Sequence, residues 1–254
     1  MSDVRILLLA NNWVGYQIAK YLRDKKENVV GLGIHSIEKQ KFTKEILDVF
    51  HFPKDLIFDG KNLRNPLVLE RIRELKPDIV IAAFWGYILM PEFTSIPPMG
   101  CINFHPGFLP YNRGMNPNVW PFIDGSPAGV TLHYITEKID GGDIIAQKRI
   151  PITMCDTAGS LEKKTWYEIV NLFKNVWSKI KIGSIRAKTQ NNKKATFHLA
   201  KDVNTLDEIF LNKTYAGAEL INILRARSYE KRSFAYFKKD GKKIFVRLEL
   251  SLEE

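Results

Sequence analysis

Short apolar runs rich in β-branched residues alternate with helix-patterned stretches through the N-terminal part of this chain. The run Val4–Leu9 comes first, and residues 13–23 then carry apolar side chains at a helical period. The pattern continues with a strand at 28–34, a helix at 41–50, a strand at 56–58, a helix at 66–75, and strands at 78–83 and 101–104. Strands that alternate with helices are joined by right-handed crossovers into a mostly parallel sheet. The sequence therefore predicts an α/β fold of Rossmann-like topology, in which ligands bind beyond the carboxyl ends of the strands.

The C-terminal half of the chain has a different pattern. The predicted elements are a short helix at 116–123, the two arms of a β unit at 128–136 and 144–152, a long helix at 157–190, a polar linker at 191–204, a helix at 215–227, and a hairpin of 233–238 with 243–250 that turns at Asp240-Gly241. At 254 residues the chain can bury a substantial core. We expect a main domain in residues 1–190, followed by a linker and a small helix with a β-hairpin in residues 191–254.

The first strand-to-helix turn excludes one common function of this topology. Its sequence, Ala10-Asn11-Asn12-Trp13-Val14-Gly15, lacks the pattern G-x-G-x-x-G. Those glycines let the backbone approach the pyrophosphate of a dinucleotide. We therefore reject a dinucleotide-dependent oxidoreductase.

Cysteine content and hydropathy favour a protein of a reducing compartment. Cys101 and Cys155 provide neither a disulfide framework nor metal-ligand spacing, so no metal is expected. The apolar run Ile6–Ala10 is too short to span a bilayer, and no basic and then apolar leader precedes it. These features predict a cytoplasmic protein without a membrane partner.

The net charge of +10 allows two interpretations. A basic surface could attract tRNA or a nucleotide diphosphate. The densest cationic stretch, Lys179–Lys194, has no aromatic residue among its cations, which weakens the nucleic-acid interpretation. A solvated lysine-rich surface explains the charge as well, and a nucleic-acid partner is not expected.

An amide, an imidazole and a carboxylate gather in two short segments, Asn103–Pro110 and Asp140–Asp143. Asn103 can donate to a developing oxyanion, and His105 can accept or deliver a proton. Asp140 can orient His105 or raise its pKa. Side chains two residues apart in an extended segment lie on the same side, which brings Asn103 and His105 together. The set suits transfer of an acyl group from a carrier to an amine. The alternative is a loop that ends in a proline turn, plus a hairpin whose Asp-Gly-Gly forms only a turn.

The pattern Asn-x-His-Pro-(Ser/Gly)-x-Leu-Pro, with an Asp seven residues after a Gly-Val-Thr-x-His strand, resembles the folate-dependent formyltransferases. The similarity extends over roughly residues 3–190 and includes Lys76–Val80, Phe84–Leu89, Arg113-Gly114 and Gly129–His133. Gly107 stands where many members have Ser, at a loop position outside the three catalytic groups. The resemblance implies transfer of a formyl group from N10-formyltetrahydrofolate to an amine by a catalytic domain in residues 1–190.

The resemblance also implies roles for individual residues. Catalysis is expected from Asn103, His105 and Asp140. The folate is expected to contact Phe84, Trp85, Gly86, Tyr87, Ile88, Leu89, Ile139 and Asp143, mainly through backbone groups and an apolar slot. A buried strand end is the alternative for the Phe84–Leu89 segment.

Contacts with the acceptor are expected from Arg113, Gly114, Asn116, Asn118 and His133. Three alternatives stay open among them. Arg113 could be a surface charge, Asn116 a helix cap before a proline, and His133 a structural histidine.

Three subfamilies, which differ in the amine that accepts the formyl group, are candidates: the sugar-nucleotide N-formyltransferases, the methionyl-tRNA formyltransferases and the glycinamide ribonucleotide formyltransferases. The sequence after Lys201 is too short for the barrel with which the methionyl-tRNA enzyme grips its acceptor stem, and the glycinamide ribonucleotide enzyme usually lacks such a tail. The stretch Arg113–Trp120 and the ending from Ile223-Leu224-Arg225-Ala226 to Phe245-Val246 resemble the sugar-nucleotide N-formyltransferases. These enzymes formylate an amino-dideoxyhexose on dTDP, GDP or UDP for surface polysaccharide such as O-antigen. A homodimer is expected through the C-terminal region. A non-catalytic folate or nucleotide-binding protein is the alternative outside the enzymes.

Overall fold

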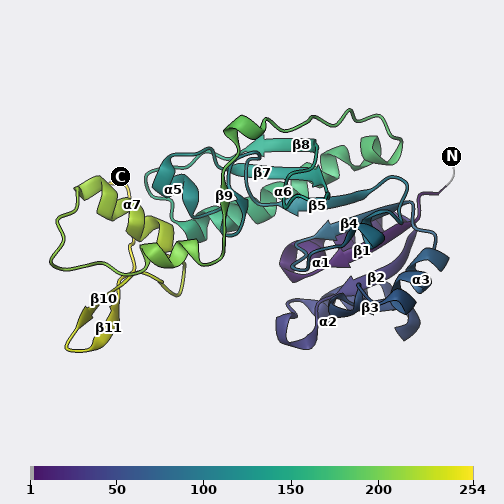
Figure 1. Ribbon diagram of the computed structural model, residues 1–254, viewed down its shortest axis with the longest axis horizontal. Helices are drawn as coiled ribbons and strands as arrows, with labels where there is room; N and C mark the ends of the chain where they lie inside the picture. The colour runs from purple at the N-terminus through teal and green to yellow at the C-terminus, as the bar shows by residue number, and fades with distance from the viewer. Residues whose placement is uncertain (1–2, 254) are drawn as a thin grey trace. The chain divides into compact units, whose positions relative to one another are not determined.

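The computed structural model describes residues 3–253, and its main feature is a seven-stranded sheet (Figure 1). The strands lie in the order β3-β2-β1-β4-β5-β7-β8. Their bounds are β1 (Ile6–Ala10), β2 (Val29–Ile34), β3 (Ile57–Asp59), β4 (Ile79–Ala83), β5 (Cys101–His105), β7 (Gly129–Tyr134) and β8 (Ile144–Arg149). The first five strands pair in parallel, whereas β7 runs antiparallel to β5. The α/β fold and its mostly parallel sheet are therefore confirmed.

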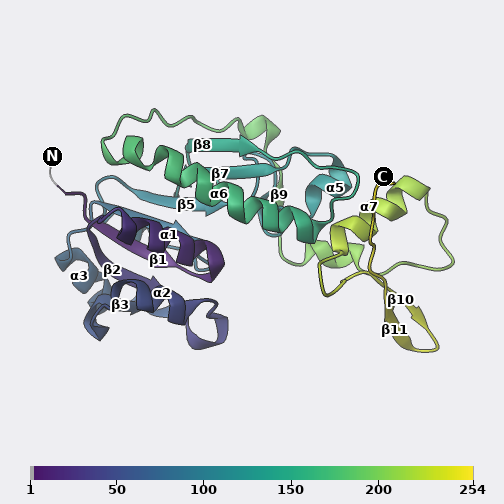
Figure 2. The ribbon, with the colours of Figure 1, turned by 180° about the vertical axis from the view of Figure 1, so that it is seen from behind.

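Helices cover both faces of this sheet. They are α1 (Asn12–Asp24), α2 (Thr43–Phe50), α3 (Pro66–Glu74), α4 (Pro91–Thr94) and the C-terminal half of α6 (Ala158–Lys181). Alternate side chains of β1, β4 and β5, Cys101 among them, share a core with α3 and α4. On the other face Phe104 packs against Phe173 of α6, and Figure 2 shows α6 on the same side as α1. Because side chains alternate along β5, Asn103 and His105 lie on the face of Cys101.

The chain folds into two compact units that interleave along the sequence. One unit holds the described residues up to His105 together with Thr131–Ala146 and Ile169–Gln190. The other holds Pro106–Val130, Gln147–Glu168 and the described residues from Asn191 onward. The division of function between residues 1–190 and 191–254 stays a prediction. Within residues 3–253, none of the helices combines the length and apolar composition that crossing a membrane requires.

The second unit contains α5 (Trp120–Asp124), α7 (Gly217–Arg227), and the hairpin of β10 (Tyr236–Lys239) and β11 (Lys242–Phe245). The C-terminal helix and hairpin are as predicted. Asp240 and Gly241 form the turn, and both have positive φ, as a two-residue hairpin turn requires. The short helix predicted at 116–123 begins later, at Trp120, because Asn116 is left-handed with φ 57°.

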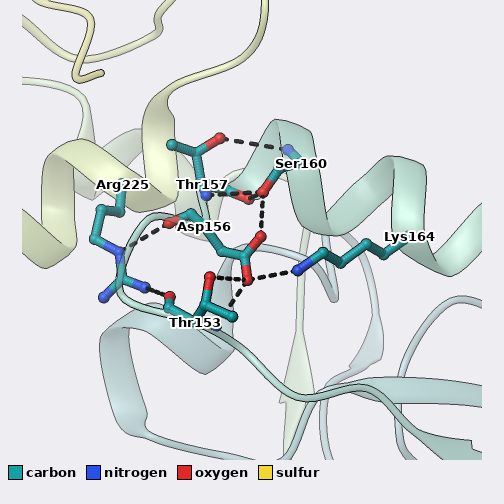
Figure 3. Close-up of polar contacts among 6 residues, drawn as sticks. All are labelled: Thr153, Asp156, Thr157, Ser160, Lys164 and Arg225. Atoms are coloured by element: carbon teal, nitrogen blue, oxygen red, sulfur yellow. Dashed lines mark hydrogen bonds and ion pairs between the residues drawn. The ribbon is translucent and has the colours of Figure 1, made fainter. Parts of the chain in front are cut away.

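A buried polar network holds the start of α6 in this second unit (Figure 3). Thr157 and Ser160 each accept a hydrogen bond from the other's main-chain N–H, the reciprocal cap that satisfies a helix start. The carboxylate of Asp156 accepts from Ser160 and from Lys164, each at 2.7 Å. Burial alone would raise the pKa of Asp156, but these bonds and those from Thr153 outweigh it and lower the pKa to about 2.

Two sequence predictions in the C-terminal half are wrong. The long helix predicted to reach residue 190 ends at Lys181, because Gly183 turns left-handed at φ 66° and donates to the main-chain oxygen of Ile180. The predicted linker at 191–204 is structured: β9 (Phe197–His198) pairs in parallel with β6 (Arg113–Gly114). The helical period of the sequence persists past Lys181, and a two-residue strand is too short to give a pattern of its own.

Candidate active site

The end of β5 carries the first two side chains of the candidate site. The antiparallel register places His133 of β7 opposite Asn103, and side chains of directly opposed residues point to the same face. Asn103 Nδ2 lies 3.1 Å from His133 Nε2. The Nδ1 atom of His133 lies 2.8 Å from the main-chain oxygen of Tyr134, so Nδ1 carries the hydrogen and Nε2 accepts from Asn103.

A tight loop brings the carboxylate of Asp140 to the same place. Asp140 is left-handed with φ 50°, and a Cβ on Gly142 would lie 1.9 Å from the main-chain oxygen of Tyr134, so only glycine fits there. Asp140 Oδ1 accepts from Asn103 Nδ2 at 3.3 Å. Asp140 Oδ2 lies 3.4 Å from His105 Nδ1, and Oδ1 lies 3.4 Å from His133 Nε2.

Asn103, His105, His133 and Asp140 thus form one cluster, which we call the amide–imidazole cluster. Side-chain exposure is 4% for His105, 2% for His133 and 11% for Asp140. Electrostatic interactions are stronger in such a site than in water. The structure brings together the three residues predicted to be catalytic. It adds His133 to them, because its ring lies as close to Asn103 as Asp140 does.

The predicted folate segment, Phe84–Leu89, follows the carboxyl end of β4. Its backbone turns at Phe84, where φ is 56°. The main-chain N–H of Gly86 donates to His35 Nε2 at 3.1 Å, and the hydroxyl groups of Ser36 and Tyr87 lie 2.6 Å apart. His35 and Ser36 come from the loop after β2, so the ends of neighbouring parallel strands hold this segment.

Aromatic packing fixes the same segment. The rings of Trp85 and Tyr87 lie 4.8 and 4.9 Å from that of His35. A Cβ on Gly60, just after β3, would lie 2.6–2.7 Å from the same two rings. The segment is therefore held rigidly by its side chains as well as by its main chain.

The remaining residues predicted to contact the folate differ in exposure. Leu89 is buried in the core, whereas Ile88 is 62% exposed and offers an apolar surface to a ligand. Ile139, beside Asp140 in sequence, is 49% exposed. The main-chain oxygen of Asp143 accepts from the N–H of Tyr134, which joins the end of the Asp140 loop to β7. Folate contacts by all of these residues stay predictions.

His35 is a residue that the sequence did not single out. The pKa of His35 is lowered, because the effect of burial is larger than the opposite effect of a hydrogen bond with the main chain of Lys39. The neutral ring is the form that can accept from Gly86. Its position directly after a predicted strand was the one available signal, because ligand-side residues of parallel sheets lie there.

The residues predicted to bind the acceptor lie in the second unit, apart from His133. Arg113 is only 9% exposed and donates to Asn192 Oδ1 at 2.9 Å, so the surface-charge alternative is wrong. A Cβ on Gly114 would lie 2.3 Å from the main-chain oxygen of His198, which explains the glycine. Asn118 is buried and donates to the main-chain oxygen of Ala158.

Asn116 also differs from its alternative role. The helix α5 has Val119 at its N-cap, so Asn116 is not that cap. Its left-handed backbone instead turns the chain between β6 and α5. Acceptor contacts by Arg113, Gly114, Asn116 and Asn118 stay predictions. Over the part of the chain that the structure describes, no three or more His, Cys, Asp or Glu side chains gather where they could hold a metal ion.

A side-chain amide, two imidazoles and one carboxylate at one end of a sheet provide the groups that a group-transfer site requires, namely hydrogen-bond donors and side chains that can move a proton. The family follows from the sequence comparisons: residues 17–176 match the formyl transferase family, and residues 202–252 match the N-formyltransferase dimerization C-terminal domain. The chain belongs to the formyl transferase family.

Individual proteins are similar over much of the chain. A methionyl-tRNA formyltransferase of Macrococcus caseolyticus is 32% identical over 73% of this chain and 59% of its own length. A dTDP-4-amino-4,6-dideoxyglucose formyltransferase of Mycobacterium tuberculosis is 36% identical over 61% of this chain and 66% of its own. The chain therefore spans less than two thirds of these relatives. A crystal structure of a 4-N formyltransferase from Francisella tularensis matches with a TM-score of 0.82 at 26% identity, covering 100% of both chains.

Proposed function

We propose that this protein transfers the formyl group of N10-formyltetrahydrofolate to the amino group of a nucleotide-linked amino-dideoxy sugar. The observation that carries the proposal is the amide–imidazole cluster, at the carboxyl edge of the sheet in a member of the formyl transferase family. Fold alone would not carry it, because one fold hosts many functions.

The reaction begins with attack of a neutral amine on the formyl carbon. The carbonyl oxygen becomes an oxyanion, the tetrahedral intermediate collapses, and the bond to N10 of the folate breaks. The amine loses one proton and N10 gains one, so the site needs an oxyanion donor and a proton relay.

Asn103 is the proposed oxyanion donor. Both hydrogens of its Nδ2 are engaged, with His133 at 3.1 Å and Asp140 at 3.3 Å. The bond to Asp140, at 3.3 Å, is longer than the ordinary range for N–H donors, so the amide can redirect that hydrogen to an oxyanion without leaving its place. His133 positions this amide, because its Nε2 accepts the other hydrogen. Loss of one oxyanion donor typically lowers the rate by about 100- to 1000-fold.

His105 is the proposed proton relay. Its Nδ1 faces the carboxylate of Asp140, so Nδ1 carries the hydrogen and the lone pair lies on Nε2. Nε2 can take the proton of the attacking amine and deliver it to N10. Asp140 stabilises the imidazolium that forms in between.

The folate is proposed to lie on the Phe84–Leu89 segment, with Ile139 and Asp143 contributing. Exposed Ile88 and Ile139 supply apolar surface, and the turned backbone at Phe84 presents main-chain groups to a pterin. When bound, the folate supplies the activated formyl group. The chain's own residues bind it, exclude water and move protons.

A sugar nucleotide is preferred to tRNA as the acceptor. The match of residues 202–252 is to a dimerization domain, and these residues form a short 3-10 helix (Asp202–Leu206), α7 and the β10–β11 hairpin. We propose Arg113, Gly114, Asn116 and Asn118 as the acceptor side. We propose that the reaction is cytoplasmic and supplies surface polysaccharide such as O-antigen. The free thiols of Cys101 and Cys155 are compatible with the reducing compartment that this location implies.

The test is release of tetrahydrofolate from N10-formyltetrahydrofolate with dTDP-, GDP- and UDP-linked 3- and 4-amino sugars, and with methionyl-tRNA alongside. Turnover with a sugar nucleotide would support the proposal if Asn103→Ala and His105→Ala abolish it. The control Asn62→Ala, at an exposed turn, should keep this turnover. Turnover only with charged tRNA would move the acceptor to the second candidate. No turnover with any acceptor would refute the proposed function.

We propose a homodimer through α7 and the β10–β11 hairpin. Ile221 on α7 and Phe245 on β11 are exposed apolar side chains in the matched dimerization segment. Light scattering of the full chain should give a dimer, and Ile221→Asp with Phe245→Asp should give a monomer. Leu67→Asp, at an exposed position of α3, is the control that should stay dimeric. A monomeric wild type would refute this assembly.

A further inference from the structure

The segment after α6 returns to the loop that carries Asp140. Beyond Gly183, the main chains of Lys188 and Ile144 exchange two hydrogen bonds, each 2.8 Å long. Gln190 follows and is 5% exposed. Its Nε2 donates to the main-chain oxygen of Asp140 at 2.8 Å and to that of Gly142 at 2.6 Å. One side-chain amide therefore holds two carbonyl groups of one short loop.

The held carbonyls are the ones that determine where the Asp140 carboxylate lies. Asp140 is left-handed, a conformation that non-glycine residues adopt only when their surroundings hold it. The loop's own turn is closed by a hydrogen bond from Gly141 N–H to the main-chain oxygen of Lys138, at 3.0 Å. That bond fixes the first half of the loop. Gln190 fixes the Asp140–Gly141 and Gly142–Asp143 peptide groups, just before the chain enters β8.

We propose that Gln190 is a positioning residue for Asp140, and through it for His105 and Asn103. This inference rests on the proposed function, because it assigns Gln190 a part in that reaction. Neither of the segments matched by the family comparisons, residues 17–176 and 202–252, includes Gln190.

The residue type fits the task. A side-chain amide has two N–H donors on one nitrogen, and the loop presents two carbonyl acceptors. The amide is neutral, so it adds no charge that would compete with the imidazoles for the Asp140 carboxylate. A lysine could donate as well, but its ammonium would pair with that carboxylate. A glutamate of the same shape could donate only while protonated.

Two variants separate positioning from a structural role. Gln190→Met keeps the length and removes both donors. Gln190→Glu keeps the shape and regains one donor when the carboxyl is protonated. A misplacement of about 1 Å in a catalytic site can cost about 100-fold in rate. We therefore expect Gln190→Met to lower kcat by about 10- to 100-fold while KM for both substrates changes little.

The pH profile provides the decisive readout. As pH falls, the kcat of Gln190→Glu divided by that of wild type should rise, because the buried carboxyl becomes protonated and donates again. The same ratio for Gln190→Met should stay flat. This comparison is made within folded protein at each pH, with far-UV circular dichroism as the check. Wild-type kcat in both variants, or flat ratios in both, would overturn the inference.

A measurement without turnover keeps this inference separate from the proposed function. Amide hydrogen exchange at residues 140–143 should be faster in Gln190→Met than in wild type, and unchanged in the control Gln40→Met, whose side chain bonds the main-chain oxygen of His35. If wild type transferred no formyl group, the proposed function would fail while this exchange result could still stand. If wild type were active and exchange at residues 140–143 were the same in Gln190→Met as in wild type, the proposed role of Gln190 would be refuted while the proposed function stood.

Discussion

Asp140→Asn is the substitution that bears most directly on the amide–imidazole cluster. Asparagine keeps the shape of the side chain, but it removes the charge and replaces one acceptor by a donor. The carboxylate oxygens lie 3.4 Å from one nitrogen of His105 and 3.4 Å from one of His133. In one orientation the NH₂ group of an asparagine would face the donor His105 Nδ1–H. In the other it would face the donor Asn103 Nδ2, with His133 Nε2 as the one acceptor nearby, and no charge would remain to stabilise an imidazolium on His105.

The magnitude follows from the distances. At 3.4 Å and an effective dielectric constant of about 20, a carboxylate stabilises an imidazolium by about 5 kcal/mol, which sets a ceiling of about 4000-fold on the rate effect. Hydrogen bonds to charged groups contribute about 1.5–3 kcal/mol net, which sets a floor of about 10-fold. We expect kcat to fall by about 100-fold or more within these limits.

The assay is steady-state release of tetrahydrofolate at saturating amino-sugar nucleotide. Asp143→Asn, the same change in the same loop, is the matched control. It should leave kcat near that of wild type and change KM for N10-formyltetrahydrofolate, because Asp143 is proposed to contact the folate. An Asp140→Asn enzyme with kcat within about threefold of wild type would refute the reasoning, since no imidazolium would then depend on the carboxylate.

Three further predictions concern titrating groups. Burial lowers the folded-state pKa of His35 below 6.5, so below about pH 6.5 the unfolded chain binds a proton that the folded chain does not. The free energy of unfolding, measured by urea titration at each pH, should therefore fall as pH drops through this window. In His35→Gln this free energy should depend less on pH, and an unchanged pH dependence would contradict the prediction. The Asp156 pKa of about 2, against 3.8, implies about 2 kcal/mol of stability at neutral pH, lost as pH falls from about 4 through about 2. Asp156→Asn should lower the free energy of unfolding by about that amount at pH 7, and most of the difference should be gone at about pH 2; an equal difference at both pH values would argue against the cause given. Burial raises the pKa of the Cys101 thiol to about 12, so a thiol reagent should label only half-buried Cys155 in the native protein and both after denaturation, and rapid native labelling of Cys101 would contradict its burial.

The parallel part of the sheet is predictable from the sequence because strands and helices there have distinct periods. Val4–Leu9 and residues 78–83 are continuous apolar runs, as strands buried on both faces require. The cluster of Asn103, His105 and Asp140 can also be predicted from the sequence, because alternation along a strand and the short loop after His133 limit where these side chains can lie.

The remaining features depend on contacts between residues distant in sequence. His35 holds the Phe84–Leu89 segment through Gly86, which lies 51 residues away in the sequence, and no sequence pattern predicts a single hydrogen bond of that kind. Gln190 lies in a stretch that the helical period assigns to α6, whereas Gly183 ends the helix. A domain boundary at residue 190 follows the order of the chain, but each compact unit is assembled from separated segments.

The most direct test of the central claim is to follow an isotope-labelled formyl group from N10-formyltetrahydrofolate by mass spectrometry. We expect the label to appear as an amide on the amino sugar of a nucleotide sugar, in a one-to-one ratio with the tetrahydrofolate released, and we expect Asn103→Ala to abolish this transfer. Label recovered only as free formate, or only on methionyl-tRNA, would contradict it.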